Sequence, residues 1–206
     1  LTGNVGPDSD PAEVTTPAAV SLLTEPFTGT DGSAWPSRWT TSATAGSVTL
    51  SGGTGRLTTN NTSGAQARAI LSGLSARTDS DVTLSYRWST TGSGSYFNVF
   101  TRGSGGWANA YRPRFGYGLE FSSGSTSVTV KKVSAGVVTT VATLTGAQAT
   151  STATQRLRIR LAGSTIQVKT WLDGQAEPTA WRTTITDTTV TTPGQLHLAV
   201  ARGNAA

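Results

Sequence analysis

Hydrophobic and polar residues alternate one by one over short stretches of this chain, most clearly between residues 155 and 172. Three aliphatic residues alternate with three arginines up to residue 161, and after the short turn at 162–164 the alternation resumes. A period of two sends successive side chains to opposite faces, so each stretch predicts a strand with one buried face. The tight connection predicts an antiparallel hairpin, and a third strand is expected at 182–186.

The same pattern predicts strands along most of the chain. Residues 81–88 alternate cleanly, and we expect 96–102 to pair with them as a hairpin. In the second of these, Phe97 and Val99 face inward, and the opposite face carries Tyr96, Asn98, Phe100 and Arg102. Further strands are expected at 22–28, 47–50, 56–60, 66–71, 115–121, 126–133, 137–144 and 195–202. Since no 3.6-residue apolar period occurs, the sequence predicts an all-β fold.

The chain divides into two parts by composition. Residues 1–21 are rich in Pro and Thr and poor in large apolar residues, which predicts an extended arm or linker. Residues 22–206 have the length of one β-sandwich domain.

Three short motifs resemble those of a known family. They are K-x-W-x-D-G-x-x-E-P-x-x-W at 169–181, Phe27-Thr28-Gly29 followed by Trp35-Pro36 and Trp39, and Gly55-Arg56-Leu57. Together they resemble concanavalin-A-like (laminin-G-like) jelly-roll domains found in secreted actinobacterial polysaccharide-active proteins and in actinobacteriophage tail proteins. The resemblance spans residues 23–201 and implies an antiparallel two-sheet jelly-roll sandwich in which the first strand lies beside a final strand. Few residues follow the strand at 195–202, so the domain is expected to lack this last strand. The strand at 22–28 would then have an open edge, paired by residues beyond 206 or by a neighbouring subunit. The resemblance leaves the activity open, because this fold hosts lectins, hydrolases, lyases and inert spacers.

The composition of the chain limits the kinds of partner that it is expected to bind. The chain has 206 residues, no cysteine and a net charge of +5 carried by scattered arginines. Stability must therefore come from burial and hydrogen bonds rather than disulfides. Scattered arginines suit a weak attraction to anionic cell-wall polymers or glycans. We expect no nucleic-acid partner and, in the absence of a long apolar run, no membrane insertion.

The sequence lacks the paired carboxylates that glycosidases of this fold use. The Glu-x-Asp-x-Glu signature of jelly-roll glucanases is absent, and Glu120 is the only acidic residue on its strand. One histidine and no cysteine exclude nucleophilic triads and structural zinc sites. That histidine, His197, is expected to be an exposed or partly covered sheet residue without a catalytic role. Calcium binds to many domains of this type, but no carboxylate cluster marks a site, so we predict no cofactor and no metal.

A glycine-rich loop at 103–114 has the residues expected of a binding site. It follows a strand and presents aromatic and basic side chains near a sheet end, where rigid β scaffolds concentrate binding residues. Sugars stack on aromatic rings and hydrogen-bond to amides and guanidinium groups. The candidate glycan-binding residues are Tyr96, Asn98, Arg102, Trp107, Tyr111 and Arg112. The alternative is that the tyrosines only pack at the sheet rim and that Trp107 only shields a loop.

The sequence therefore predicts a non-catalytic surface-recognition module that binds cell-surface or cell-wall polysaccharide. Its expected location is a virion surface or the extracellular space, on a phage particle or as a secreted actinobacterial protein. A structural virion protein, such as a minor tail or capsid decoration protein whose faces contact other subunits, is the alternative. A polysaccharide hydrolase or lyase is the third reading.

Overall fold

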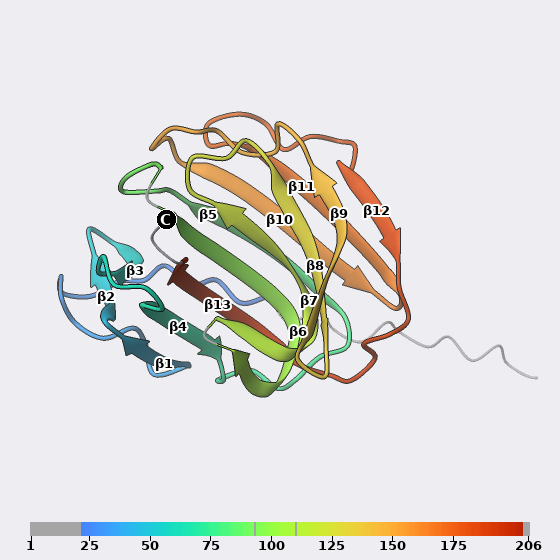
Figure 1. The fold of residues 1–206 in the computed structure, drawn as a ribbon, viewed down its shortest axis with the longest axis horizontal. Helices are drawn as coiled ribbons and strands as arrows, with labels where there is room; N and C mark the ends of the chain where they lie inside the picture. The colour runs from blue at the N-terminus through green and yellow to red at the C-terminus, as the bar shows by residue number, and fades with distance from the viewer. Residues whose placement is uncertain (1–21, 93, 110, 204–206) are drawn as a thin grey trace, which may run out of the picture.

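A computed structural model describes residues 22–92, 94–109 and 111–203, and in these ranges the protein is built of β-strands without a helix. Two antiparallel sheets pack face to face, and a separate hairpin lies beside them (Figure 1). This confirms the predicted all-β, antiparallel two-sheet jelly-roll sandwich. The arm predicted at 1–21 lies outside the described residues. No described helix is long and apolar enough to cross a membrane.

The larger sheet has seven strands. Their order across the sheet is β1 (Trp39–Thr44), β4 (Gln66–Leu71), β13 (Gln195–Arg202), β6 (Ser95–Asn109), β7 (Arg112–Ser122), β8 (Val128–Ser134) and β9 (Val137–Leu144). The four-stranded sheet has the order β12 (Thr183–Thr186), β11 (Thr165–Leu172), β10 (Gln155–Ala162) and β5 (Ser80–Tyr86). The separate hairpin is β2 (Gly46–Ser51) with β3 (Thr54–Thr59).

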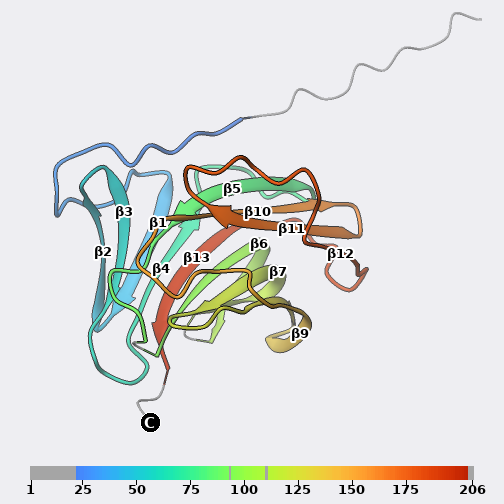
Figure 2. The same ribbon diagram turned by 90° about the horizontal axis from the view of Figure 1, so that it is seen from above.

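The core lies between the two sheets, as Figure 2 shows from above. Leu157, Ile159 and Leu161 of β10 are almost completely buried, as their alternation with arginine predicted. They belong to one apolar cluster with Val99 of β6 and Leu119 of β7, on the inner face of the other sheet. Each inner face thus supplies the alternate residues of its strands, which is the usual core of a sandwich.

The prediction of a strand at 22–28 is wrong, because this segment is irregular. Pro26 has no N–H for a ladder, and Phe27 adopts a positive φ of 51°, which breaks an extended run. The ring of Phe27 instead packs on Trp35 and Trp39, with centroids 4.6 and 6.0 Å away. The open edge that called for a partner strand is therefore not present. The edges of the large sheet are β1 and β9.

The prediction that residues 81–88 and 96–102 form a hairpin is also wrong. β5 pairs with β10, whereas β6 pairs with β13 and β7 in the other sheet. The two strands meet through their apolar faces instead, with the rings of Tyr86 and Phe97 5.3 Å apart across the core. Alternation identified the core-facing apolar residues of both strands correctly but not the strand beside each of them.

Candidate functional site

A polar band crosses the outer face of the seven-stranded sheet, the face turned away from the core. Residues in direct register across five neighbouring strands form this band. They are Arg68 on β4, Ala199 on β13, Asn98 on β6, Glu120 on β7 and Thr129 on β8. Only one of these five residues, Asn98, is among the candidate binding residues that the sequence predicts. Adjacent positions on such a row have Cβ atoms roughly 5 Å apart, so a single bound molecule can contact several of them.

The connection between β6 and β7 folds back over this outer face. We name residues 103–109 and 111–114 the β6–β7 tip. Three register shifts interrupt the pairing of the two strands, and Gly105 and Gly106 have φ values of 74° and 69°. Glycine tolerates such angles, and bulges increase the bend of a strand. The curl at the foot of the sheet in Figure 1 is this tip.

The fold-back brings aromatic rings onto the sheet. Tyr111 of the tip stacks on Tyr96 at the start of β6, with centroids 6.3 Å apart and planes 4° from parallel. Trp107 packs edge-on against His197 of β13 at 4.9 Å, and the guanidinium of Arg68 lies 5.2 Å from the centre of its ring. The structure therefore brings both predicted tyrosines together and places Trp107 on the same face.

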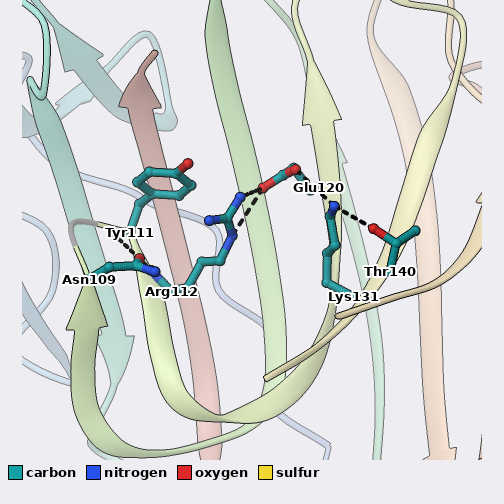
Figure 3. Close-up of polar contacts among 6 residues, drawn as sticks. All are labelled: Asn109, Tyr111, Arg112, Glu120, Lys131 and Thr140. Atoms are coloured by element: carbon teal, nitrogen blue, oxygen red, sulfur yellow. Dashed lines mark hydrogen bonds and ion pairs between the residues drawn. The ribbon is translucent and has the colours of Figure 1, made fainter. Parts of the chain in front are cut away.

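Two cations share one carboxylate beside the stacked tyrosines. The Nε of Arg112 donates to Glu120 Oε2 at 3.1 Å, and Lys131 Nζ lies 3.5 Å from Oε1 of the same side chain (Figure 3). The guanidinium of Arg112 also lies 4.3 Å from the centre of the Tyr111 ring, and Lys131 donates to Thr140. This group combines N–H donors with carboxylate acceptors at one place, as binding of a sugar's hydroxyl groups requires.

Asn109 shapes the turn that presents these residues. Its Oδ1 accepts hydrogen bonds from the backbone N–H groups of Arg112 and Tyr111, at 3.1 and 3.3 Å (Figure 3). Asparagine commonly stabilises turns by bonding to its own backbone two or three residues on. Burial raises the pKa of Tyr111, while the nearby charge of Arg112 acts against that rise. The ring is therefore a neutral phenol near pH 7.

Asn98 is the clearest sign that the band binds something. Its side chain is fully buried, yet neither its amide nitrogen nor its amide oxygen has a hydrogen-bond partner among the residues that the structure describes. An unsatisfied buried polar group typically costs about 1–3 kcal/mol, so folding alone does not favour it. The hydroxyl of Thr129, two strands away in the same row, is also buried without a partner. A ligand hydroxyl or a water molecule at each of the two positions would satisfy these groups, since it donates and accepts.

Arg102 does not join the other predicted site residues, and the face predicted for it is wrong. It has a positive φ of 50° at the point where the first register shift begins, which reverses the alternation. Its buried guanidinium donates to the carbonyls of Thr78, Gly163 and Val190, and Asp79 lies 3.5 Å away. Arg102 therefore fastens connecting segments at one end of the sandwich.

The sheet residue His197 is buried, contrary to the prediction that it is exposed or partly covered. Trp107 of the tip covers it, and Gly103 lies so close that a Cβ there would be 2.1 Å from the imidazole. Burial lowers the pKa of His197 to about 4, although a backbone hydrogen bond to the carbonyl of Gln195 opposes the shift. The imidazole is therefore neutral near pH 7.

Glu120 has no second carboxylate beside it. Its cross-strand neighbours are Asn98 and Thr129, and the residues two positions away on its own strand are Gly118 and Ser122. Paired-carboxylate glycosidases need a second acid about 5–10 Å from the first. Within the described ranges, no group of three or more His, Asp or Glu residues could hold a metal ion. The arrangement can hydrogen-bond and stack.

The sequence matches no family model and no curated protein sequence. In structure it is similar to the carbohydrate binding module CBM66 from Bacillus subtilis, with 16% identity, a TM-score of 0.55, and coverage of 81% of this chain and 92% of that one. The calcium-bound exoplasmic/lumenal domain of VIP36 has 17% identity and a TM-score of 0.58, over 87% and 82% of the two chains. Bacillus licheniformis β-glucanase has 12% identity and a TM-score of 0.52, over 88% and 85%. Identities this low establish the jelly-roll fold and leave the function to the site.

Proposed function

We propose that the protein is a non-catalytic module that binds carbohydrate on the outer face of its seven-stranded sheet. The observation that carries this proposal is the buried Asn98, whose side-chain amide has no hydrogen-bond partner in the described part of the chain. Tyr96, two residues earlier on the same strand, stacks on Tyr111. Amides bind sugar hydroxyls, and aromatic rings contact the apolar faces of sugar rings. A buried donor and acceptor without partners, next to aromatic rings, suits a ligand with both kinds of surface.

The group formed by Arg112, Glu120 and Lys131 adds specificity. A charged donor or acceptor makes a shorter and stronger hydrogen bond than a neutral one. Since one carboxylate lies between two cations, this group has a net charge of only +1. It suits hydroxyl groups better than it suits a strongly anionic polymer. The solved structures of similar fold include a carbohydrate binding module, which is consistent with this use of the fold.

We further propose that the module acts outside the cell, on a phage particle or as part of a secreted actinobacterial protein. This part of the proposal is supported by the resemblance of residues 23–201 to domains of such proteins. The ligand would then be a cell-surface or cell-wall polysaccharide.

A glycan array that includes cell-wall polysaccharides of high-GC Gram-positive bacteria tests the proposal. We expect binding to at least one polysaccharide class, and loss of that signal in the Asn98→Leu variant. Reducing-end and unsaturated-product assays on the bound polysaccharide should stay at background. Binding to none of the glycans would overturn the proposal in favour of a structural role, and sustained turnover would overturn its non-catalytic part.

A further inference from the structure

A small pocket lies next to the polar band. It is lined in part by His197 of β13, the residue that Trp107 contacts. Its volume is about 210 Å³. The chain segments that form it are the glycine-rich start of the β6–β7 tip and the residues that lead into β13. The lining residues are Ile70, Ala76, Gly103, Ser104, Gly105, Gly106, Pro193, Gly194, Gln195 and His197.

Two of these residues carry buried polar atoms that have no hydrogen-bond partner within the described ranges. They are the Nε2 of His197 and the Oγ of Ser104. His197 is only 2% exposed. Its Nδ1 lies 3.3 Å from the carbonyl oxygen of Gln195, and a carbonyl can only accept, so this contact requires the proton on Nδ1. Nε2 of the neutral ring is then a bare acceptor, whereas the serine hydroxyl can donate.

The remaining side chains of the pocket are small and apolar, apart from the amide of Gln195. Ile70, Ala76 and Pro193 offer methyl and methylene groups, and none of the lining residues carries a carboxylate, an ammonium or a guanidinium group. Such a pocket disfavours a charged occupant, because nothing in its lining would compensate a desolvated charge. It favours a short group with an apolar end, one N–H donor and one carbonyl acceptor.

We propose that this pocket binds the acetamido group of an N-acetylhexosamine. The ligand N–H donates to Nε2 of His197, the ligand carbonyl accepts from the hydroxyl of Ser104, and the methyl group contacts Ile70, Ala76 and Pro193. The sugar ring then extends toward Trp107, whose ring contacts His197. This inference rests on the proposed carbohydrate-binding function and names the ligand class for one end of the site.

The imidazole of His197 provides a direct readout. It is the only histidine of the chain, so its ring nitrogen signals in a ¹⁵N NMR spectrum belong to one residue without further assignment. We would titrate the protein at neutral pH with the methyl glycosides of N-acetylglucosamine, N-acetylgalactosamine, glucose and galactose. At least one N-acetylated glycoside should shift the Nε2 signal, and its 2-hydroxy counterpart should bind about tenfold more weakly or worse, since it cannot satisfy the two polar groups. An Nε2 signal that no N-acetylated glycoside shifts would overturn the inference.

Two variants separate the pocket from the rest of the site. Ala76 is exposed, so Ala76→Leu fills the pocket without disturbing the core, and Ser104→Ala removes the hydroxyl. Each should abolish the preference for the N-acetylated sugar. The matched control Ala176→Leu introduces the same side chain at an exposed position that does not line the pocket, and it should retain the preference. Preference retained in Ala76→Leu would contradict the assignment.

The outcomes distinguish this inference from the proposed function. Binding of polysaccharides on the array, with no preference for N-acetylated over 2-hydroxy sugars, would overturn the acetamido pocket and leave the carbohydrate-binding function in place. Binding of no saccharide at all would overturn both.

Discussion

The phenol rings of Tyr96 and Tyr111 lie within 4° of parallel, with centroids 6.3 Å apart, although 14 residues of a curled hairpin separate them. Tyr96 is at the start of β6, and Tyr111 is near its far end, where the β6–β7 tip has folded back over the sheet. This contact fixes the tip over the polar band and places Arg112 beside Glu120. The candidate site therefore depends on the curl of a single hairpin, and the following variants test its parts.

Replacing Asn98 by leucine should separate stability from function. The substitution removes two unsatisfied buried polar atoms and keeps the branched shape of the side chain, so the free energy of unfolding should rise by about 1–3 kcal/mol. Glycan binding should fall by at least about tenfold, because the amide is lost. Urea unfolding and a binding titration measure the two effects. The matched control is Gln155→Leu. The side chain of Gln155, which is also buried, hydrogen-bonds to the backbone N–H and carbonyl of Ala149, so this variant should be less stable than the parent protein. A destabilised Asn98→Leu variant would contradict this account.

Trp107→Ala should weaken glycan binding by about 1 kcal/mol or more, as expected for the loss of an aromatic contact. The melting temperature should change less, because Trp107 is only half-buried. Trp181→Ala is the control: that ring is also half-buried and lies 4.5 Å from the ammonium of Lys169, on the other sheet. It should leave binding unchanged. A drop in stability with unaltered binding would instead make Trp107 a structural residue.

The ion pair of Arg112 with Glu120 should contribute more to stability than an exposed pair does. The two side chains are 15% and 11% exposed, whereas those of Arg156 and Asp173 are 47% and 42% exposed. Solvent screens the exposed pair, for which a coupling below about 1 kcal/mol is typical. Double-mutant cycles with Arg112→Met and Glu120→Gln, and with Arg156→Met and Asp173→Asn, would measure both couplings. Equal values would show that the β6–β7 tip does not hold Arg112 against the sheet.

Acidification should destabilise the protein through His197. Its pKa is about 4 in the folded protein and about 6.5 in the unfolded chain, so the unfolded state binds a proton first as the pH falls. This loss begins below about pH 6.5, continues to about pH 4, and amounts to a free energy on the order of 2–3 kcal/mol. Unfolding in urea at neutral pH and at about pH 4.5 would show it. In the His197→Phe variant, the loss of unfolding free energy over this pH window should be smaller by that amount. An unchanged loss would show that other groups cause it.

Alternation along the chain was enough to predict most strands and their buried faces. The expected strands at 137–144 and 195–202 agree with β9 and β13 to the residue. Strand partners were less predictable, because a period of two describes which side of a strand is buried and says nothing of its neighbour. For this reason β5 and β6 were expected to form one hairpin, although they belong to different sheets.

The arrangement of the candidate site was predicted in part from the sequence, and the errors have a local cause. Tyr96, Asn98, Trp107, Tyr111 and Arg112 do lie on one face, as the sequence suggested. Arg102 does not, because a positive φ and a bulge reverse the alternation at that residue, and no pattern in the sequence marks the reversal. Glu120 appeared as a single carboxylate on its strand. Its contact with Arg112, eight residues earlier, exists only because the tip folds back.

The position of β13 has a consequence for how the protein is made. This strand comes last among the described strands, yet it lies inside the large sheet between β4 and β6 and pairs with both. While the ribosome is still synthesising residues 195–202, β4 and β6 each have an unpaired edge, and the apolar faces beside them are open to water. Such edges attract other strands and favour aggregation. The seven-stranded sheet can therefore close only after this segment has emerged, so the domain cannot complete its folding until its last described strand has been synthesised.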